Sequence, residues 1–412
     1  MGGVLIRAVW KSEKNPIPIF SSAIALIALV SGLLFPYVAC SSDMKIPIAM
    51  LGLEAEAHVP LSLLEPLIDR SGLAGAEQGI RDNNTTGRFT GQSYSVVSSK
   101  VKHEELIEKA FRDLHAQGVR LFVVNLPADR LLKLADLPEA QDSLLFNIGA
   151  LDDSLRHRSC RANLLHTVPS RAMLADALAQ YLAWKRWNKW FLVVGRHPRD
   201  KAFAESLKRA AKRFGGKIVE QKEWTFKPGA RRTDSGHTNE QQEVKAFTQV
   251  GDYDILLVAD EMDEFGEYLS YRTYRPRPVG GTQGLSPAAW SRVHEQWGAT
   301  QFQRRFNKKT GQWMTESDYS AWLAVRSIGE AATRTASSDT GKLRDFMLGQ
   351  EFKLAAFKGS PVTYRNWNGQ LRQPLLITSP RVMISVSPQK GFLHQFSTLD
   401  TLGYDRPETT CQ

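Results

Sequence analysis

The sequence predicts two doubly wound α/β lobes. Short apolar runs alternate with longer amphipathic segments after Ser42, and the same alternation begins again near Ser170. Strands separated by helices in this way pair in parallel and are covered by helices on both faces. A chain of 412 residues also has room for two domains.

In the first block, the helix expected over His103–Gln117 is the clearest, because its apolar residues recur every three or four positions and Gly118 follows it. The other expected helices are Leu67–Asp82 and Ala128–Ala135. The expected strands are Lys45–Gly52, Tyr94–Ser98, Leu121–Val124 and Leu144–Ile148, and Asn163–His166 begins the crossover to the second block.

The second block repeats this order. The expected helices are Ser170–Lys185, Lys201–Phe214 and a short one over Asp263–Leu269. The expected strands are Trp190–Val194, Lys217–Val219 and Ile255–Ala259, and the polar segment Pro228–Thr238 is expected to be a surface loop.

The remaining third region differs in pattern. Helices are expected over Trp290–Asn307 and Asp318–Thr333, with Gly311 between them, and strands over Phe352–Phe357, Gln373–Thr378 and Val382–Val386. The Asn368-Gly369 pair within Tyr364–Gln370 is typical of a hairpin turn.

The N-terminus has the features of an export signal. Met1–Lys14 is basic, Ile17–Phe35 is largely apolar, and small residues follow. We therefore expect residues 1–41 to be a signal peptide, with an uncleaved membrane anchor as the alternative. Tyr37-Val38-Ala39-Cys40 resembles a lipoprotein cleavage box, in which Cys40 would take lipid.

Export would place the chain in an oxidising compartment, where cysteines tend to pair. Cys160 and Cys411 are the two cysteines left if Cys40 is lipidated or lost. We expect a disulfide between them, which would tie the C-terminal tail to the first half of the chain. Two free buried thiols are the alternative.

Charge and motifs narrow the classes of function. The net charge of +10 indicates either a solvated basic surface or attraction to anionic partners. Signatures of nucleic-acid-binding modules are absent from the sequence, as are the usual nucleotide, zinc-protease and nucleophile motifs, so we expect no nucleic-acid partner, no enzymatic activity and no cofactor. The four acidic residues in Asp260–Glu264 would either bind a cation or mark the start of a helix.

Ligands of open parallel sheets bind beyond the carboxyl ends of the strands. Polar residues at those ends are the candidate ligand-binding set. They are Glu54, Asn125, Asn147, Ser170, Arg171, Asp200, Asp260, Glu261, Thr282 and Gln283. Ser170 would either cap a helix or help that helix accept an anion. A tyrosine- and arginine-rich segment, Tyr268–Arg277, would either face a partner or a ligand or pack between the lobes.

The general pattern resembles the type I periplasmic substrate-binding proteins of ABC transporters, in particular the branched-chain amino-acid binders. His166–Ser170 is similar to the crossover between their lobes, and Gly195–Asp200 to a strand-to-loop motif of their second lobe. Two later segments, Phe306–Ala331 and Phe357–Gln370, are similar to their late helices and closing stretch. The resemblance implies a hinge between the lobes, and Ser170, Asp260 and Glu261 as candidates for holding a ligand.

Four further segments resemble the subfamily encoded with PQQ-dependent alcohol dehydrogenase systems. These are Ser170–Leu182, Arg277–Leu285, Asn368–Leu375 and Leu399–Cys411. The resemblance implies a periplasmic protein that binds a small polar molecule, works with an ABC permease and is linked to quinoprotein alcohol oxidation. PQQ itself carries carboxylates that Ser170 and Arg171 would suit.

From pattern and resemblance together, we expect residues 42–166 to form lobe 1 and residues 167–283 to form lobe 2. Residues 284–345 would return to lobe 1, and residues 346–412 would return to lobe 2 and form the tail. Two rival functions remain. One is an accessory protein that docks to a quinoprotein dehydrogenase or its cytochrome, and the other is a hydrolase that uses Asp260, Glu261 and His166.

Overall fold

The computed structural model describes residues 44–54, 68–69, 71–225, 243–270 and 272–411. Ser42–Gln412 form one compact unit. The expected signal peptide, Cys40 and the expected loop Pro228–Thr238 lie outside the described residues. In the part of the chain that is described, no helix combines the length and the apolar character needed to cross a bilayer.

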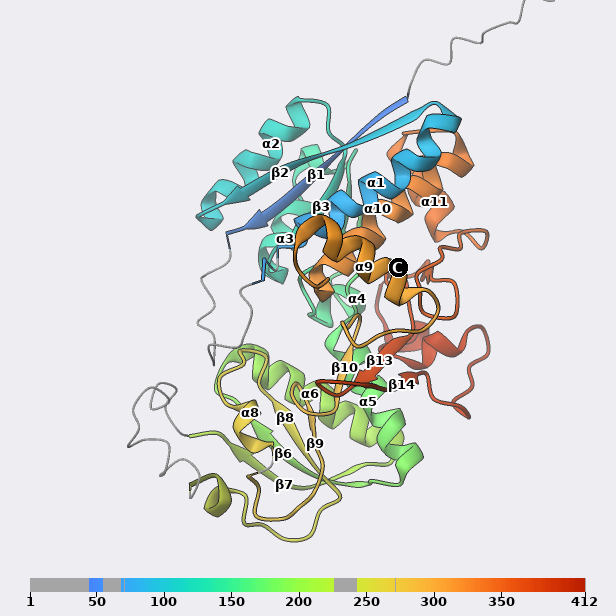
Figure 1. Ribbon diagram of the computed structural model, residues 1–412. Coiled ribbons are helices and arrows are strands. Elements are labelled where there is room, and N and C mark those ends of the chain that lie inside the picture. The colour runs from blue at the N-terminus through green and yellow to red at the C-terminus, as the bar shows by residue number, and fades with distance from the viewer. Residues whose placement is uncertain (1–43, 55–67, 70, 226–242, 271, 412) are drawn as a thin grey trace, which may run out of the picture. The chain divides into compact units, whose positions relative to one another are not determined.

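The first lobe is built on a five-stranded parallel sheet with the order β2-β1-β3-β4-β5 (Figure 1). Its strands are β1 (Met44–Leu53), β2 (Gln92–Val101), β3 (Leu121–Asn125), β4 (Leu144–Asn147) and β5 (Leu164–His166). The helices that follow these strands are α1 (Leu73–Thr90), α2 (Ile107–Ala116), α3 (Ala128–Ala135) and α4 (Ser154–His157). Short 3-10 turns lie at η1 (Glu104–Leu106) and η2 (Pro138–Ala140).

The second lobe is built on a four-stranded parallel sheet with the order β7-β6-β8-β9. Its strands are β6 (Lys189–Val194), β7 (Lys217–Glu223), β8 (Ile255–Ala259) and β9 (Val279–Gly281). Its helices are α5 (Arg171–Lys185), α6 (Pro198–Phe214) and α8 (Gly266–Leu269).

The rest of the chain adds helices and small antiparallel sheets. The helices are α9 (Ala299–Thr310), α10 (Glu316–Thr335) and α11 (Thr340–Leu348), with 3-10 turns η4 (Thr398–Thr401) and η5 (Arg406–Glu408). The strands are β10 (Ser286–Ala288), β11 (Thr363–Tyr364), β12 (Leu371–Arg372), β13 (Leu375–Thr378) and β14 (Met383–Ser387). Strands β10, β13 and β14 form one antiparallel sheet, and β11 pairs with β12 as the predicted hairpin.

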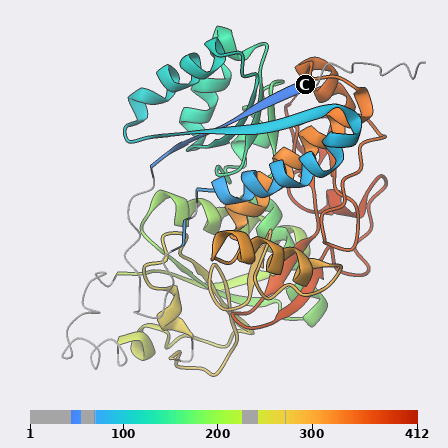
Figure 2. The same ribbon diagram turned by 45° about the horizontal axis from the view of Figure 1, so that its top comes forward.

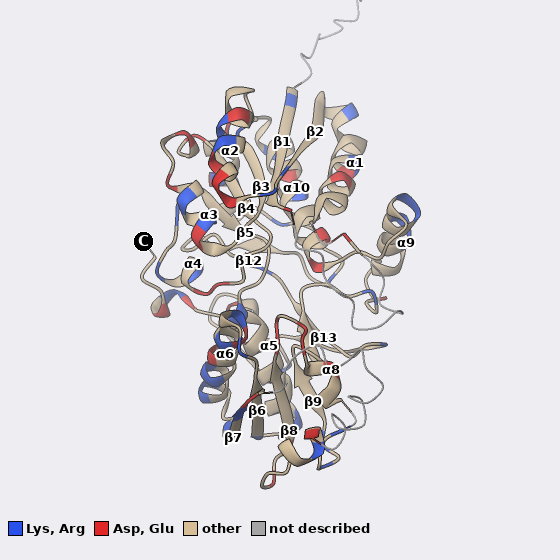
Figure 3. Ribbon diagram, turned by 90° about the vertical axis from the view of Figure 1, so that its left-hand side faces the viewer, with Lys and Arg blue, Asp and Glu red and all other residues tan. Residues whose placement is uncertain are grey.

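Each parallel sheet buries apolar residues on both faces, as the doubly wound prediction requires. In the first lobe, Ile48 and Val123 pack toward α10, whereas Ala49 and Phe122 pack toward α2 and α3. Figure 3 shows the first sheet between these two sets of helices. In the second lobe, Leu192 joins the core with α5 and α6 and neighbouring Val193 joins the opposite core.

The chain crosses between the two cores three times. Leu165 belongs to the first core and Met173 to the second. The chain returns between Leu285, which packs on the second core, and Trp290, in the first. It crosses again between Leu371 and Leu375. Residues from Phe352 to Leu371 therefore pack with the first lobe, and the chain rejoins the second lobe at Leu375.

Helices α1 and α10 lie side by side in Figures 1 and 2 although they are far apart in the sequence. A β-carbon at Gly75 would lie 1.8 Å from the Asp318 carbonyl oxygen, so only glycine permits this approach. Helix α1 begins at Leu73, after Gly72, and runs to Thr90, whereas the sequence predicted a helix that ends at Asp82. Packing against α10 explains why its polar second half, which has weak helix propensity, stays helical.

Two predictions of local structure were wrong. Trp290–Gly298 is not helical, because Trp297 and Gly298 have positive φ angles of 52° and 85° and the helix begins only at Ala299. The expected strand Phe352–Phe357 does bury alternate side chains, but it makes only an isolated bridge between Leu354 and Val362. Alternation predicts the buried face of a segment, whereas a strand also requires a neighbouring edge to pair with.

Candidate functional site

The first-lobe candidates follow three adjacent strands. Glu54 comes directly after β1, Asn125 ends β3 and Asn147 ends β4. Because these strands are parallel neighbours, the residues lie at one edge of the sheet. Asn125 Nδ2 donates to the Ser71 carbonyl oxygen at 3.2 Å, so this edge also meets the start of α1.

Asn147 is used within the fold. Its Oδ1 accepts from the backbone N–H groups of Gly149 and Ala150, and its Nδ2 donates to the Ala150 carbonyl at 2.8 Å. The same Nδ2 lies 3.1 Å from His166 Nδ1. His166 is buried, and burial lowers its pKa well below the usual value, so the imidazole is neutral at physiological pH.

The second-lobe candidates follow the adjacent strands β6, β8 and β9 and bond to one another. The buried Asp200 carboxylate accepts from the Glu261 backbone N–H at 2.7 Å, and burial raises its pKa. Thr282 Oγ1 accepts from the Asp260 N–H at 2.9 Å. Gln283 Nε2 donates to the Asp260 carbonyl at 3.1 Å. These contacts tie the three strand ends into one polar network.

The acidic segment after β8 starts a helix. Asp260 accepts hydrogen bonds from the backbone N–H groups of Glu264, Phe265 and Gly266, at the beginning of α8. Among the residues that the structure describes, no group of three His, Cys, Asp or Glu side chains is placed to hold a metal ion. The geometry therefore supports the helix-start interpretation for Asp260, whereas Asp263 accepts from Gln283 and Glu261 pairs with Arg171.

Arg171 connects the strand ends of the two lobes. Its guanidinium donates to both carboxylate oxygens of Glu261, which follows β8, at 2.7 and 2.8 Å. It also lies 3.3 Å from the carboxylate of Asp152, in the segment that follows β4. The Arg171 and Glu261 side chains are only 4% and 8% exposed. Burial acts to lower the pKa of Arg171, but the bonds and charges of Glu261 and Asp152 raise it overall.

Ser170, the neighbour of Arg171, is the N-cap of α5, and its hydroxyl accepts from the Met173 N–H at 3.3 Å. This satisfies one of the free donors at the start of the helix. The Ala172 N–H bonds to Asp153 in the first lobe. The start of α5 is thus held by protein groups from both lobes.

Several polar residues at these edges were missed by the sequence analysis. Arg199, in the first turn of α6, donates to Glu261 at 3.2 Å and is half exposed. In the first lobe, Lys100 near the end of β2 pairs with Asp69 at 3.2 Å. Asp152 also belongs to this set. All three residues, Lys100, Arg199 and Asp152, lie at or after the carboxyl ends of parallel strands. A search of those strand ends for polar residues, which gave the other candidates, could therefore have found them.

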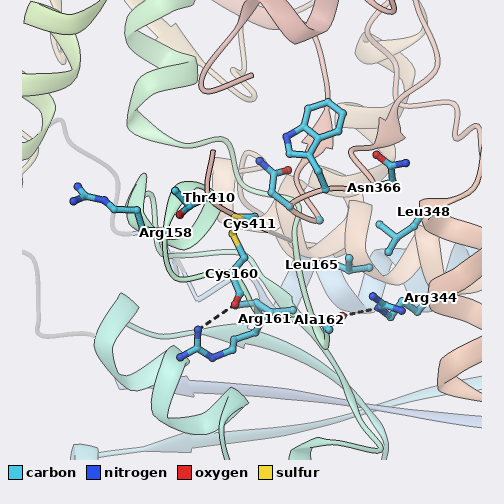
Figure 4. Close-up of a pocket in the computed structure, with 14 residues that line it drawn as sticks. Arg158, Cys160, Arg161, Ala162, Leu165, Arg344, Leu348, Asn366, Thr410 and Cys411 are labelled. Carbon is cyan, nitrogen blue, oxygen red and sulfur yellow. Dashed lines mark hydrogen bonds between the residues drawn. A yellow bond between two sulfur atoms is a disulfide. The ribbon is translucent and has the colours of Figure 1, made fainter. Parts of the chain in front are cut away.

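The structure joins Cys160 and Cys411 by a disulfide, with the two Cα atoms 5.7 Å apart. A hollow of about 280 Å³ lies beside it, lined in part by Arg344, Asn366 and Trp367. Figure 4 shows the Arg158 and Arg161 side chains pointing away from the middle of this hollow. The candidate ligand-binding residues do not line it, so it is separate from the strand-end network.

Comparisons with known proteins agree with this architecture. Residues 66–230 match the family model described as periplasmic binding protein. A search of the curated proteins gave no match. A periplasmic binding protein from Burkholderia mallei is similar in structure, with a TM-score of 0.61 at 15% identity over 90% of this chain and 99% of that chain.

Two further solved structures are similar. A branched chain amino acid ABC transporter periplasmic ligand-binding protein from Burkholderia xenovorans LB400 has a TM-score of 0.62 at 15% identity, over 83% of this chain and 95% of that chain. The second is a solute binding protein of an ABC transporter from Rhodopseudomonas palustris BisB5, in complex with 3,4-dihydroxy benzoic acid. Its TM-score is 0.61 at 13% identity, over 83% of this chain and 97% of that chain. The chain has the type I periplasmic binding protein fold, which confirms the predicted fold class.

Proposed function

We propose that this protein is an exported solute-binding component of an ABC-type transport system and that it binds a small polar molecule between the strand ends of its two lobes. The observation that carries this proposal is Arg171, which reaches Asp152 after β4 and Glu261 after β8 at the same time. It brings the carboxyl edges of two parallel sheets together, where such folds bind ligands.

Binding would work by closure of the lobes. The three crossings of the chain form the hinge between the lobes. A ligand that contacts the strand ends of both lobes stabilises the closed conformation, because only that conformation allows both contacts. A permease would then recognise that conformation. The protein acts without enzymatic chemistry in this proposal, because His166 is buried beside Asn147 and Asp260 is occupied in starting α8.

The proposed chemistry of the ligand follows from the charged side chains at the strand ends that are exposed enough to contact it. The charge of Arg171 is neutralised by Glu261. Arg171 therefore holds the strand ends in place and does not offer a free cation to a ligand. Glu54 is exposed at the first-lobe edge, and Arg199 is half exposed at the second-lobe edge, where it shares the Glu261 carboxylate with Arg171. A ligand anion would contact the exposed side of the Arg199 guanidinium, and Glu54 would supply the opposite charge. This pairing suits a zwitterion or a hydroxy acid. The solved structures that the chain resembles include proteins whose titles name branched-chain amino-acid transport and a dihydroxybenzoic acid ligand.

The finer proposal is a link to PQQ-dependent alcohol oxidation in the periplasm. It is supported by the resemblance of segments such as Leu399–Cys411 to the subfamily encoded with those dehydrogenases. In this proposal the ligand is PQQ or a substrate or product of alcohol oxidation. Export by residues 1–41, with or without lipid on Cys40, belongs to the same proposal.

Purification under conditions that retain ligand, followed by mass spectrometry, tests the function directly. Calorimetric titration with PQQ, short alcohols, their acids and amino acids then gives the affinity. Arg199→Ala should weaken binding by about tenfold to a hundredfold, because a hydrogen bond to a charged group contributes about 1.5–3 kcal/mol. Arg304→Ala on α9 removes the same charge at an exposed position and should change nothing. Absence of both retained ligand and heat of binding would refute the proposal.

One observation favours a second candidate, an accessory protein without a small ligand. The second-lobe polar groups are satisfied by one another, with Asp200 bonded to Glu261 and Gln283 bonded to Asp260. In that case a surface such as Tyr268–Arg277, where Tyr274 is 44% exposed, would dock a quinoprotein dehydrogenase or its cytochrome. A thermal shift with a metabolite supports the binding protein, whereas capture of a dehydrogenase from periplasm without any such shift supports the accessory protein.

A further inference from the structure

Three loops meet at the amino-terminal edge of the second sheet, opposite the strand ends described above. They are the loop before β6, the loop before β7 and the segment after β14. The Lys217 N–H bonds to the Asn188 carbonyl at 2.7 Å, which joins the first two loops. The Gln389 N–H bonds to Gln180 on α5 at 3.0 Å, which attaches the third.

Large apolar side chains are exposed on this edge. Trp184 near the end of α5 is 57% exposed, and Leu393 and Phe396 in the segment after β14 are 84% and 82% exposed. Trp184 lies one helical turn beyond Gln180, which bonds to Gln389, so α5 carries it toward this segment. Phe392 packs on Phe214 at the end of α6, with ring centroids 5.5 Å apart. We call Trp184, Leu393 and Phe396 the apolar patch.

Basic residues are exposed on the same loops and helix ends as the apolar patch. The basic rim consists of Lys185, Arg186, Lys212, Lys217 and Lys390, all exposed. Figure 3 shows Lys and Arg along α6, which contributes Lys212. Lys185 Nζ lies 4.9 Å from the centre of the Trp184 ring, so the rim and the patch are in direct contact. Within the described residues, no carboxylate lies within ion-pairing distance of a rim residue.

Acidic residues close to this edge bond to groups outside the rim, and Glu205, which lines a hollow together with Lys212 and Lys217, pairs with Lys208 at 2.8 Å. Asp252 contacts Arg277 at 3.0 Å and Lys189 at 3.8 Å. Asp254 accepts from the backbone N–H groups of Asn188 and Lys189, each at 2.8 Å. These contacts join none of the acids to a rim residue, so no rim residue is neutralised by a direct ion pair with them.

We propose that the apolar patch and the basic rim dock the protein on an anionic lipid surface. Exposed tryptophan, leucine and phenylalanine insert at the boundary of lipid headgroups, and lysine and arginine are attracted by anionic headgroups. Protein–protein interfaces are instead depleted of lysine, which makes up most of this rim. Docking here leaves the carboxyl edges of the sheets free, so it is independent of the proposed ligand binding.

Co-sedimentation with vesicles tests this inference. The exported protein is used with an identical N-terminus in every variant, so any contribution of residues before Met44 cancels. Equimolar POPC and POPG vesicles should bind the protein, with weaker binding at high salt, and pure POPC vesicles should bind it at least tenfold more weakly, because each lysine near an anionic surface contributes about 1 kcal/mol.

Two pairs of variants make the test specific. Leu393→Ser with Phe396→Ser, and Lys212→Glu with Lys217→Glu, should each lower the binding to POPG vesicles about tenfold or more. The matched controls are Phe89→Ser, at a side chain that is 81% exposed on α1, and Lys308→Glu with Lys309→Glu on α9. The controls should bind like the unchanged protein.

Equal binding by all variants would overturn the inference, as would failure of the unchanged protein to bind POPG vesicles. Capture of an acidic periplasmic protein that the patch variants lose, in the absence of vesicle binding, would also overturn it in favour of a protein partner. Near-ultraviolet circular dichroism of each variant verifies that the fold is intact. Affinity for the small ligand should be unchanged by the patch variants.

Discussion

Glu261 and Arg171 form a two-bond ion pair, with nitrogen-to-oxygen distances of 2.7 and 2.8 Å, in a place where both side chains are almost fully buried. The pair holds the start of α5 against the end of β8, and Asp152 of the first lobe lies within 3.3 Å of the same guanidinium. This arginine and the two carboxylates around it therefore form one of the contacts that join the lobes, beside bonds such as that of the Ala172 N–H with Asp153.

Glu261→Gln should destabilise the protein by about 2–3 kcal/mol, measured by urea unfolding. Removing one partner of a buried pair leaves the other charge without full compensation, and Asp152 replaces only part of the lost interaction. Glu264→Gln, three residues further along and exposed, is the matched control and should stay within about 0.5 kcal/mol of the unchanged protein. Equal effects of the two substitutions would show that the pair does not stabilise the contact between the lobes.

Lys358 should make stability depend on pH. Burial lowers its pKa to about 7, and its Nζ donates to Gln373 and to the Pro374 carbonyl. Between about pH 7 and the unfolded pKa of about 10.4, the unfolded state binds more protons than the folded state. The free energy of unfolding should therefore rise with pH across this window, by up to about 1.4 kcal/mol per unit.

Lys358→Met should remove this rise, whereas Lys353→Met, at an exposed lysine five residues earlier, should keep it. The measurement is the midpoint of denaturant unfolding at several pH values from 6 to 10. A profile of the Lys358 variant that matches the unchanged protein would contradict the assignment.

Loss of the Cys160–Cys411 disulfide should lower the free energy of unfolding by about 2–5 kcal/mol. The bond joins residues 251 positions apart, so it closes a long loop and restricts the unfolded chain. Cys411→Ser and the double serine variant should be equally destabilised, because either one removes the same bond. Chemical denaturation of the oxidised proteins measures the effect, and a stability equal to that of the unchanged protein would show that the bond is not formed in the purified protein.

Gly75→Ala should cost about 3 kcal/mol, because the new β-carbon would force α1 away from α10 at the Asp318 carbonyl. Gly118→Ala should cost about 1–2 kcal/mol for a different reason, since this glycine has a φ of +90° but open space around it. Gly251→Ala meets neither constraint and should be neutral or slightly stabilising. Thermal unfolding of the three variants ranks them, and a different order would contradict the packing argument.

Most of the fold could be predicted from the sequence because its periodic elements are local. The pattern over Ala128–Ala135 predicts α3 with the same bounds that the structure shows. Part of the candidate site was predictable because parallel strands end at the same edge of a sheet. This rule predicts that residues such as Asp200 and Glu261, which follow neighbouring strands, lie close together. The partners of those residues were not predictable, because Arg171 could equally have faced a ligand.

The sequence by itself determined two doubly wound sheets, most of the strands and helices that alternate in them, and the positions of the strand ends, since these follow from apolar periodicity and short connections. Tertiary structure alone decided that α1 extends to Thr90 against α10, that Phe352–Phe357 lacks a pairing strand, and that the charges of Arg171 and Glu261 satisfy each other. These outcomes depend on which surfaces meet in space, and contacts between residues far apart in the chain leave no local pattern to read.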